Sequence, residues 1–146
     1  MKHIKPYKIF ESNLSQYFEP DVVKKSEELI DDIKDILLEL SDIGYRTDVD
    51  FAPFLRRYLS YNTPVIQISI TKPLGVSDGI RFDPLWSDDD EKVEFDDVIL
   101  RVLGYITSEG YKYEYQGIKS PAEHIKGQIV RYMISIYKEN ETPKNI

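Results

Sequence analysis

The sequence predicts an α+β fold in which two helices lie on one face of a four-stranded antiparallel sheet. Two segments, which begin near Pro20 and Ser87, carry apolar residues at the spacing of an amphipathic helix. Each segment is closed by a glycine, Gly44 or Gly110. Each glycine is followed by two stretches in which apolar and polar residues alternate, as they do in strands. The chain is therefore predicted to contain two helix–strand–strand units.

The first unit spans residues 20–72. Pro20 falls just before or within the first helical turn, where its missing N–H costs nothing. Residues 45–51 and 65–72 alternate in polarity and predict two strands, the second with one wet face. The helix is predicted from apolar residues at helical spacing: Val22, Val23, Leu29, Ile30, Ile33, Ile36, Leu37 and Leu40.

The second unit spans residues 87–138. Ser87 is predicted to cap its helix, with Asp90 at the third helical position, where an acid also suits the helix dipole. Residues 111–116 and 132–137 alternate in polarity and predict the last two strands. The helix is predicted from another apolar stripe: Val93, Phe95, Val98, Ile99, Val102, Leu103 and Ile106.

The two units align without gaps at an offset of 66 residues. Internal duplication is one interpretation of this likeness. The alternative is convergence, because helix capping and strand alternation follow the same physics in both units. Both interpretations predict the same architecture. The identical pairs include Asp31/Asp97, Ile33/Ile99, Leu37/Leu103, Gly44/Gly110, Tyr45/Tyr111, Ile68/Ile134, Ser69/Ser135, Ile70/Ile136 and Lys72/Lys138.

The same pass along the chain predicts its domain organisation. Residues 20–138 are expected to form a single α+β domain, with a turn-rich linker at 73–86 between the units. Residues 1–19 are expected to form an N-terminal leader or arm, and residues 139–146 a tail.

Composition excludes several classes of function. The 146 residues include 26 acidic and 19 basic side chains, a formal net charge of −7, which disfavours direct binding to nucleic acid or to an anionic membrane. There is no cysteine, so disulfides, thiol catalysis and thiolate metal sites are excluded. No apolar run approaches the roughly 18 residues that a bilayer-spanning helix needs.

Charged residues of two predicted strands share the outer sheet face. Arg46, Asp48 and Asp50 belong to the first unit, and Lys112 and Glu114 belong to the second. If these strands are neighbours, their carboxylates converge and supply the oxygen ligands that Mg²⁺ or Ca²⁺ prefers. The alternative is a solvated face with cross-strand charge pairs. We expect no metal and no cofactor.

An acidic run occupies residues 88–97, where seven carboxylates and one lysine sum to −6. One interpretation is an acidic helix start. Another is a surface that mimics nucleic acid, or meets a protein partner. Trp86 directly precedes the run and either packs against the helix entry or anchors the partner. The candidate partner surface comprises Trp86, Asp88, Asp89, Asp90 and Glu91.

Two other features are weaker. Tyr111, Tyr113 and Tyr115 are core residues or line a groove for an apolar ligand between the units. His124 lies in a predicted loop with no nucleophile beside it. The chain contains no nucleotide-binding glycine loop, no nucleophile elbow and no paired-histidine zinc motif. We therefore expect a protein that is not an enzyme.

The N-terminal residues resemble the start of small uncharacterised proteins of T-even-like tailed phages. The resemblance covers about a dozen residues from Met1 to Ser12 and, more loosely, about another dozen between Leu37 and Asp50. The stretch from Met1 to Ser12 is also similar to the capsid-targeting leader of internal head proteins in such phages. Leaders of that kind are cut after an aliphatic-x-Glu triplet, which implies a processing site formed by Ile9, Glu11 and Ser12. His3 and Pro6 depart from a regular amphipathic leader.

These observations lead to an expected function. We expect a non-enzymatic phage accessory protein that binds another protein, in the host cytoplasm or packaged in the virion head. Two alternatives stay open: a domain that binds a small molecule in the cleft between the units, and an acidic inhibitor that mimics nucleic acid. The identity of the partner and the oligomeric state do not follow from the sequence.

Overall fold

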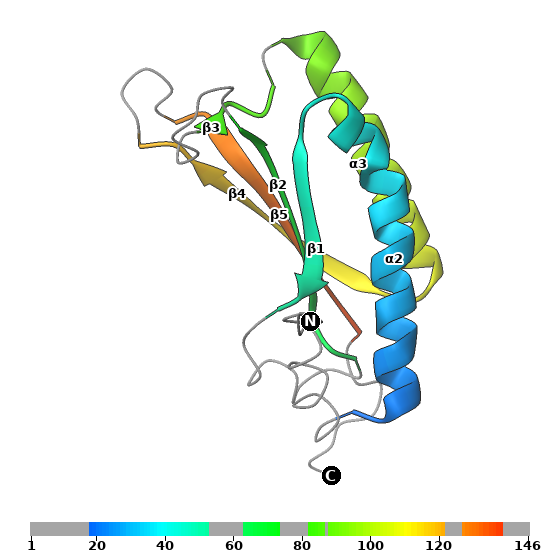
Figure 1. Cartoon of the computed structure of the whole chain (residues 1–146). Coiled ribbons are helices and arrows are strands. Elements are labelled where there is room, and N and C mark those ends of the chain that lie inside the picture. Colours follow the sequence, from blue (N-terminus) through cyan, green and yellow to red (C-terminus); the bar gives the residue numbers. More distant parts are fainter. Residues whose placement is uncertain (1–17, 53–62, 74–81, 87, 122–126, 139–146) are drawn as a thin grey trace, which may run out of the picture.

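The computed structural model describes residues 18–52, 63–73, 82–86, 88–121 and 127–138. Both helices lie on the same side of the sheet, as Figure 1 shows. The predicted α+β fold is therefore confirmed. The elements are α2 (Pro20–Asp42), β1 (Arg46–Phe51), β2 (Ile66–Pro73), β3 (Phe82–Asp83), α3 (Asp89–Ser108), β4 (Lys112–Lys119) and β5 (Ile129–Tyr137).

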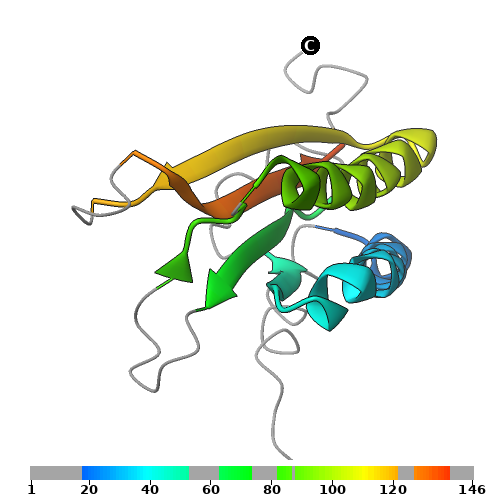
Figure 2. The same cartoon turned by 90° about the horizontal axis from the view of Figure 1, so that it is seen from above.

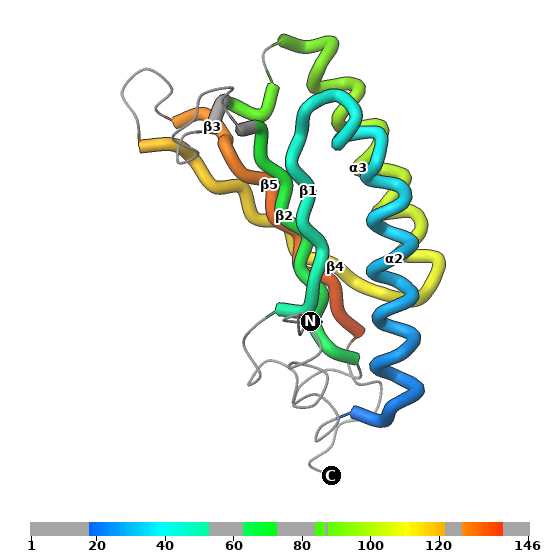
Figure 3. The backbone as a smooth tube through the Cα atoms, in the orientation of Figure 1, coloured from blue at the N-terminus to red at the C-terminus, as the bar shows by residue number. Residues whose placement is uncertain are grey.

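The main sheet has the strand order β1-β2-β5-β4, and each neighbouring pair is antiparallel. Strands β2 and β5 are central, whereas β1 and β4 form the two edges; Figure 3 traces this path. The short β3 pairs with the end of β2. The predicted linker at 73–86 therefore contains more structure than expected, because Pro73 ends β2 and Phe82–Asp83 form β3.

The hydrogen-bonded registers of the two hairpins agree at the offset of 66 residues. Arg46 pairs with Thr71 in the first hairpin, and Lys112 pairs with Tyr137 in the second. At the centre of the sheet, Ile68 pairs with its own counterpart Ile134. Two helix–strand–strand units thus meet across the β2–β5 pair. Internal duplication as the origin of this likeness stays a prediction.

The core lies between the helix layer and one face of the sheet, and Figure 2 shows these two layers from above. The isoleucines of β2 and β5 line that face, and Ile68 and Ile134 are fully buried. From the helices, Leu37 and Phe95 are also fully buried. Alternation in the strands and helical periodicity in α2 and α3 therefore place one apolar surface of each layer against the other.

Helix α2 begins and ends as the sequence predicts. Pro20 occupies the first helical turn after Glu19, whose side chain makes no capping hydrogen bond. Beyond Ile43, Gly44 has φ of +104°, a left-handed conformation that favours glycine. Gly110 ends the second helical segment in the same way, with φ of +86°.

Replacing Gly44 by alanine is expected to lower the free energy of unfolding by about 1 kcal/mol, because the left-handed conformation strains a Cβ atom. No heavy atom lies within 4 Å of that Cβ, so the loss is conformational. Gly104 is a matched control within α3, also with nothing within 4 Å. Gly104→Ala should stabilise the protein by about 1 kcal/mol. Urea denaturation followed by circular dichroism measures both, and shifts of the same sign would contradict this explanation.

Helix α3 begins one residue later than predicted. Asp88, rather than Ser87, is its N-cap residue, and its carboxylate accepts a hydrogen bond of 2.8 Å from the Glu91 N–H. The predicted position of Asp90 in a capping box is therefore wrong, and Glu91 occupies the third helical position. Aspartate caps as well as serine does, so the sequence offered two adjacent starts.

Neither described helix combines the length and the apolar composition that crossing a membrane requires.

Candidate functional site

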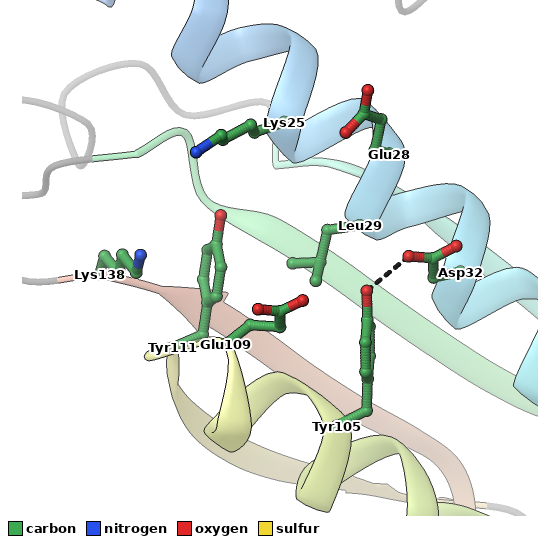
Figure 4. A pocket seen from close by; sticks show the side chains of 8 residues that line it. All are labelled: Lys25, Glu28, Leu29, Asp32, Tyr105, Glu109, Tyr111 and Lys138. Carbon is green, nitrogen blue, oxygen red and sulfur yellow. Dashed lines mark hydrogen bonds between the residues drawn. The ribbon is translucent and has the colours of Figure 1, made fainter.

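A pocket of about 290 Å³ lies between the two helix–strand–strand units. Helix α2 supplies one wall from the first unit, and the end of α3 and the residues that flank β4 and β5 supply the other. Figure 4 shows the side chains that surround the cavity, from α2 on one side and from the second unit on the other. The lining residues are Lys25, Glu28, Leu29, Asp32, Tyr105, Glu109, Tyr111 and Lys138.

One side of the pocket is closed by a hydrogen bond between the helices. The Tyr105 hydroxyl donates to the Asp32 carboxylate at 2.5 Å, the dashed contact in Figure 4. Burial, followed by this bond to a negative charge, raises the pKa of Tyr105 well above its usual value. Tyr105 therefore remains a neutral donor at neutral pH and holds Asp32 as a fixed carboxylate.

The other side of the pocket is formed by Tyr111 and Lys138. The Lys138 ammonium lies over the Tyr111 ring, 4.9 Å from its centroid. Gly110 leaves room for this arrangement, because a Cβ there would lie only 3.1 Å from the Lys138 Cε atom. Tyr111 is only 8% exposed, and burial raises the pKa of its hydroxyl. Its ring is thus a rigid wall of the pocket.

The pocket holds charges of both signs that are not paired with one another. The lining includes two amines, of Lys25 and Lys138, and three carboxylates, of Glu28, Asp32 and Glu109. Among the described residues, no ion pair joins any of these amines to a carboxylate. In Figure 4 the lysines lie on one side of the cavity, and Asp32 lies on the other.

The sequence left open whether the three tyrosines are core residues or line a groove between the units. Tyr111 is buried in the core and also lines the pocket, whereas Tyr113 and Tyr115 do neither, and most of the lining is charged rather than apolar. No signal in the sequence marks the α2 residues of the pocket, although Lys25, Glu28 and Asp32 follow helical spacing. A polar stripe of this kind also occurs on helix faces that contact only solvent. Only the packing of the second unit beside α2 shows that these residues line a pocket.

A cluster of aromatic rings lies over the sheet near the start of α3. Phe95 is fully buried, and its ring lies 5.3–5.4 Å from those of Tyr45, Trp86 and Tyr132. Burial is the main cause that raises the pKa of Tyr132 to about 12, and nearby groups such as Tyr115 and Asp96 add smaller electrostatic contributions. The sequence left the role of Trp86 open, and the structure packs it edge-on against Phe95, beneath the Lys92 amine. Trp86 is therefore partly buried rather than an exposed anchor.

The acidic run has two different parts. Asp88, Asp89 and Asp90, three residues of the candidate partner surface, are exposed. Glu91 departs from it, because its carboxylate turns inward, accepts a hydrogen bond of 2.8 Å from the Tyr45 hydroxyl and pairs with the Lys72 ammonium. Glu91 thus ties α3 to the first unit.

The outer-face carboxylates of the two units do not converge, because the condition for it, that their strands are neighbours, is not met. Pairing registers place Asp48, Asp50 and Glu114 on the face opposite the core, as predicted. Their strands, however, are the two edges of the sheet, with β2 and β5 between them. Three strand spacings amount to about 14 Å. Arg46 pairs with Asp48 of its own strand at 3.3 Å, and Lys112 lies on β4, the opposite edge. Among the described residues, no group of three or more His, Cys, Asp or Glu side chains is placed to hold a metal ion.

The edge strand β4 carries two exposed aromatic residues. Tyr113 and Tyr115 pair with the buried Ile136 and Ile134, so they lie on the core face of the sheet. They are nevertheless 44% and 48% exposed. The predicted alternation is therefore correct, but at this edge the helix layer does not bury the apolar side.

Several predicted residues lie outside the described part of the chain. The leader with its processing site at Ile9, Glu11 and Ser12 is among them, as are His124 and residues 139–146.

The fold and the pocket together define a two-layer α+β protein with a charged cavity between two similar units. Comparison with models of known families, with curated proteins and with solved structures gave no significant match.

Proposed function

We propose that the protein binds another protein, and that the partner adds an extended segment to the sheet along β4. The observation that carries this proposal is an eight-residue edge strand that is exposed from Lys112 to Gln116. No described strand pairs with its outer edge. Edge strands direct alternate N–H and C=O groups outward, and added strands bind through these groups.

The side chains of β4 support a specific partner. Tyr115 is held in place, because its ring lies 4.4 Å from that of Tyr132 and its hydroxyl occupies the space that a side chain at Gly117 would take. Tyr113 lies beside it on the same face. Exposed aromatic residues with restricted rotamers are typical of binding hot spots, since little side-chain entropy is lost on association.

The charge on β4 defines the chemistry of the partner. Glu114 projects from the face opposite the tyrosines. A complementary segment therefore carries a basic residue opposite Glu114 and apolar residues beside Tyr113 and Tyr115. This alternation of apolar and basic residues in the partner would make its binding to β4 specific, unlike nonspecific aggregation along the edge.

Affinity capture from a lysate of the source cells, with the full chain as bait, tests this proposal. Tyr113→Lys places a charge on the edge, a device that natural proteins use against strand addition. The matched control is Leu38→Lys, because Leu38 is 55% exposed on α2. We expect a partner that the wild type and the Leu38 variant retain and the Tyr113 variant loses.

Two results would contradict strand addition at β4. One is a partner that all three baits capture equally. The other is the absence of any partner together with self-association of the wild type in light scattering.

A phage origin, a location in the host cytoplasm or virion head, a cleaved leader and the lack of enzymatic activity stay predictions. They rest on the N-terminal resemblance and on the absence of catalytic motifs from the sequence. The mimicry of nucleic acid rests on the exposed Asp88, Asp89 and Asp90. This alternative is weakened because the inward-turned Glu91 contributes nothing to that surface.

A further inference from the structure

We infer that the pocket between the two units binds a small zwitterion that carries one ammonium and one carboxylate group, such as a free amino acid. This site is separate from β4 and goes beyond the proposed binding of a protein. Its cavity of about 290 Å³ has the volume of roughly ten water molecules, at about 30 Å³ each. That volume fits one small molecule.

The charges of the pocket select the ligand class. Lys25 and Lys138 suit a carboxylate, whereas Asp32 and Glu109 suit an ammonium group. With Glu28 included, three carboxylates and two amines give the pocket a net charge of −1, which disfavours phosphates and dicarboxylates. An amine without a carboxylate would leave the two lysine ammonium groups without a ligand oxygen to bind.

The pocket is also organised before any ligand arrives. The Tyr105 hydroxyl fixes the Asp32 carboxylate, and the Tyr111 ring carries the Lys138 ammonium on its face. Leu29, only 5% exposed, adds an apolar surface between these polar walls. Fixed charges lower the entropy lost on binding, and the apolar surface suits the aliphatic or aromatic side chain of an amino acid.

The experiment is a thermal-shift screen of the full chain against the free amino acids and ω-amino acids, followed by calorimetric titration of each hit. A ligand that binds only the folded protein raises the unfolding temperature as its concentration rises. For each hit, the decarboxylated amine and the deaminated acid are titrated as analogues. We expect the zwitterion to bind, and each analogue to bind at least about tenfold more weakly, because each lacks one charged contact.

Variants locate the site. Lys25→Gln and Glu109→Gln should each weaken binding about tenfold. Lys24→Gln is the matched control, since Lys24 is an exposed neighbour on α2 that does not line the pocket. It should change the affinity less than twofold.

Three outcomes would overturn the inference: no zwitterion binds, an amine analogue binds as tightly as its zwitterion, or the Lys25 and Glu109 variants bind like the wild type. None of these variants alters β4. A failure here therefore leaves the capture experiment on Tyr113 unaffected, and the reverse also holds.

Discussion

Phe95→Ala is expected to lower the free energy of unfolding by about 3–5 kcal/mol. Phe95 is fully buried, and its ring touches those of Tyr45, Trp86 and Tyr132, which come from three different parts of the chain. Truncation removes apolar burial and three ring contacts at once, and it leaves a cavity that these rigid neighbours fill poorly.

Urea denaturation measures this loss, with tryptophan fluorescence as a second probe because Trp86 contacts the deleted ring. Leu100→Ala is the matched control on the same helix. Leu100 is 67% exposed, so its truncation should change stability by no more than about 0.5 kcal/mol. Equal effects of the two substitutions would mean that Phe95 does not organise the core between α3 and the sheet.

The ion pair between Glu91 and Lys72 is expected to couple the two units energetically. Both side chains are only about a fifth exposed, 21% and 22%, and the Glu91 carboxylate also accepts the Tyr45 hydroxyl. A double-mutant cycle with Glu91→Gln and Lys72→Met should give a coupling energy of about 1–3 kcal/mol, because partial burial weakens solvent screening.

The pair of Arg101 with Glu39 provides the control. It also links the two units, but its side chains are 48% and 58% exposed. Its coupling energy should remain below about 1 kcal/mol. Adding salt should reduce the Arg101 coupling by the larger fraction, since exposed charges are the more strongly screened. A coupling energy of zero between Glu91 and Lys72 would show that this contact does not join the units.

Local signals explain why the elements of this fold are predictable. Pro20, Gly44 and Gly110 act through the conformation of their own backbone, so they mark helix ends wherever the helix packs. Alternation in the strands likewise identifies the buried face before any partner strand is known. The start of α3 was misplaced because Ser87 and Asp88 are adjacent residues that cap equally well.

Strand order was harder to predict. Antiparallel hairpins follow from short connections, yet either strand of a hairpin is able to take the central position. The run of isoleucines in β2 and β5 was the available signal, because a central strand has two neighbours and carries fewer charges. Asp48 and Glu114 mark the edge strands by the same reasoning. The sequence alone left the strand order open, so only the tertiary structure decided that the two charged strands are not neighbours.

The sequence by itself determined the two helices, the four strands of the main sheet and the side of each that points toward the core, because capping, periodicity and alternation act over a few residues. Only the tertiary structure decided which distant residues meet. Asp32 and Tyr105 are 73 positions apart, and nothing local in either predicts their hydrogen bond. The pocket, the inward turn of Glu91 and the exposed tyrosines of β4 all arise from how two similar units pack across β2 and β5. That packing needs two apolar surfaces from distant parts of the chain, and a short stretch of sequence describes only one of them.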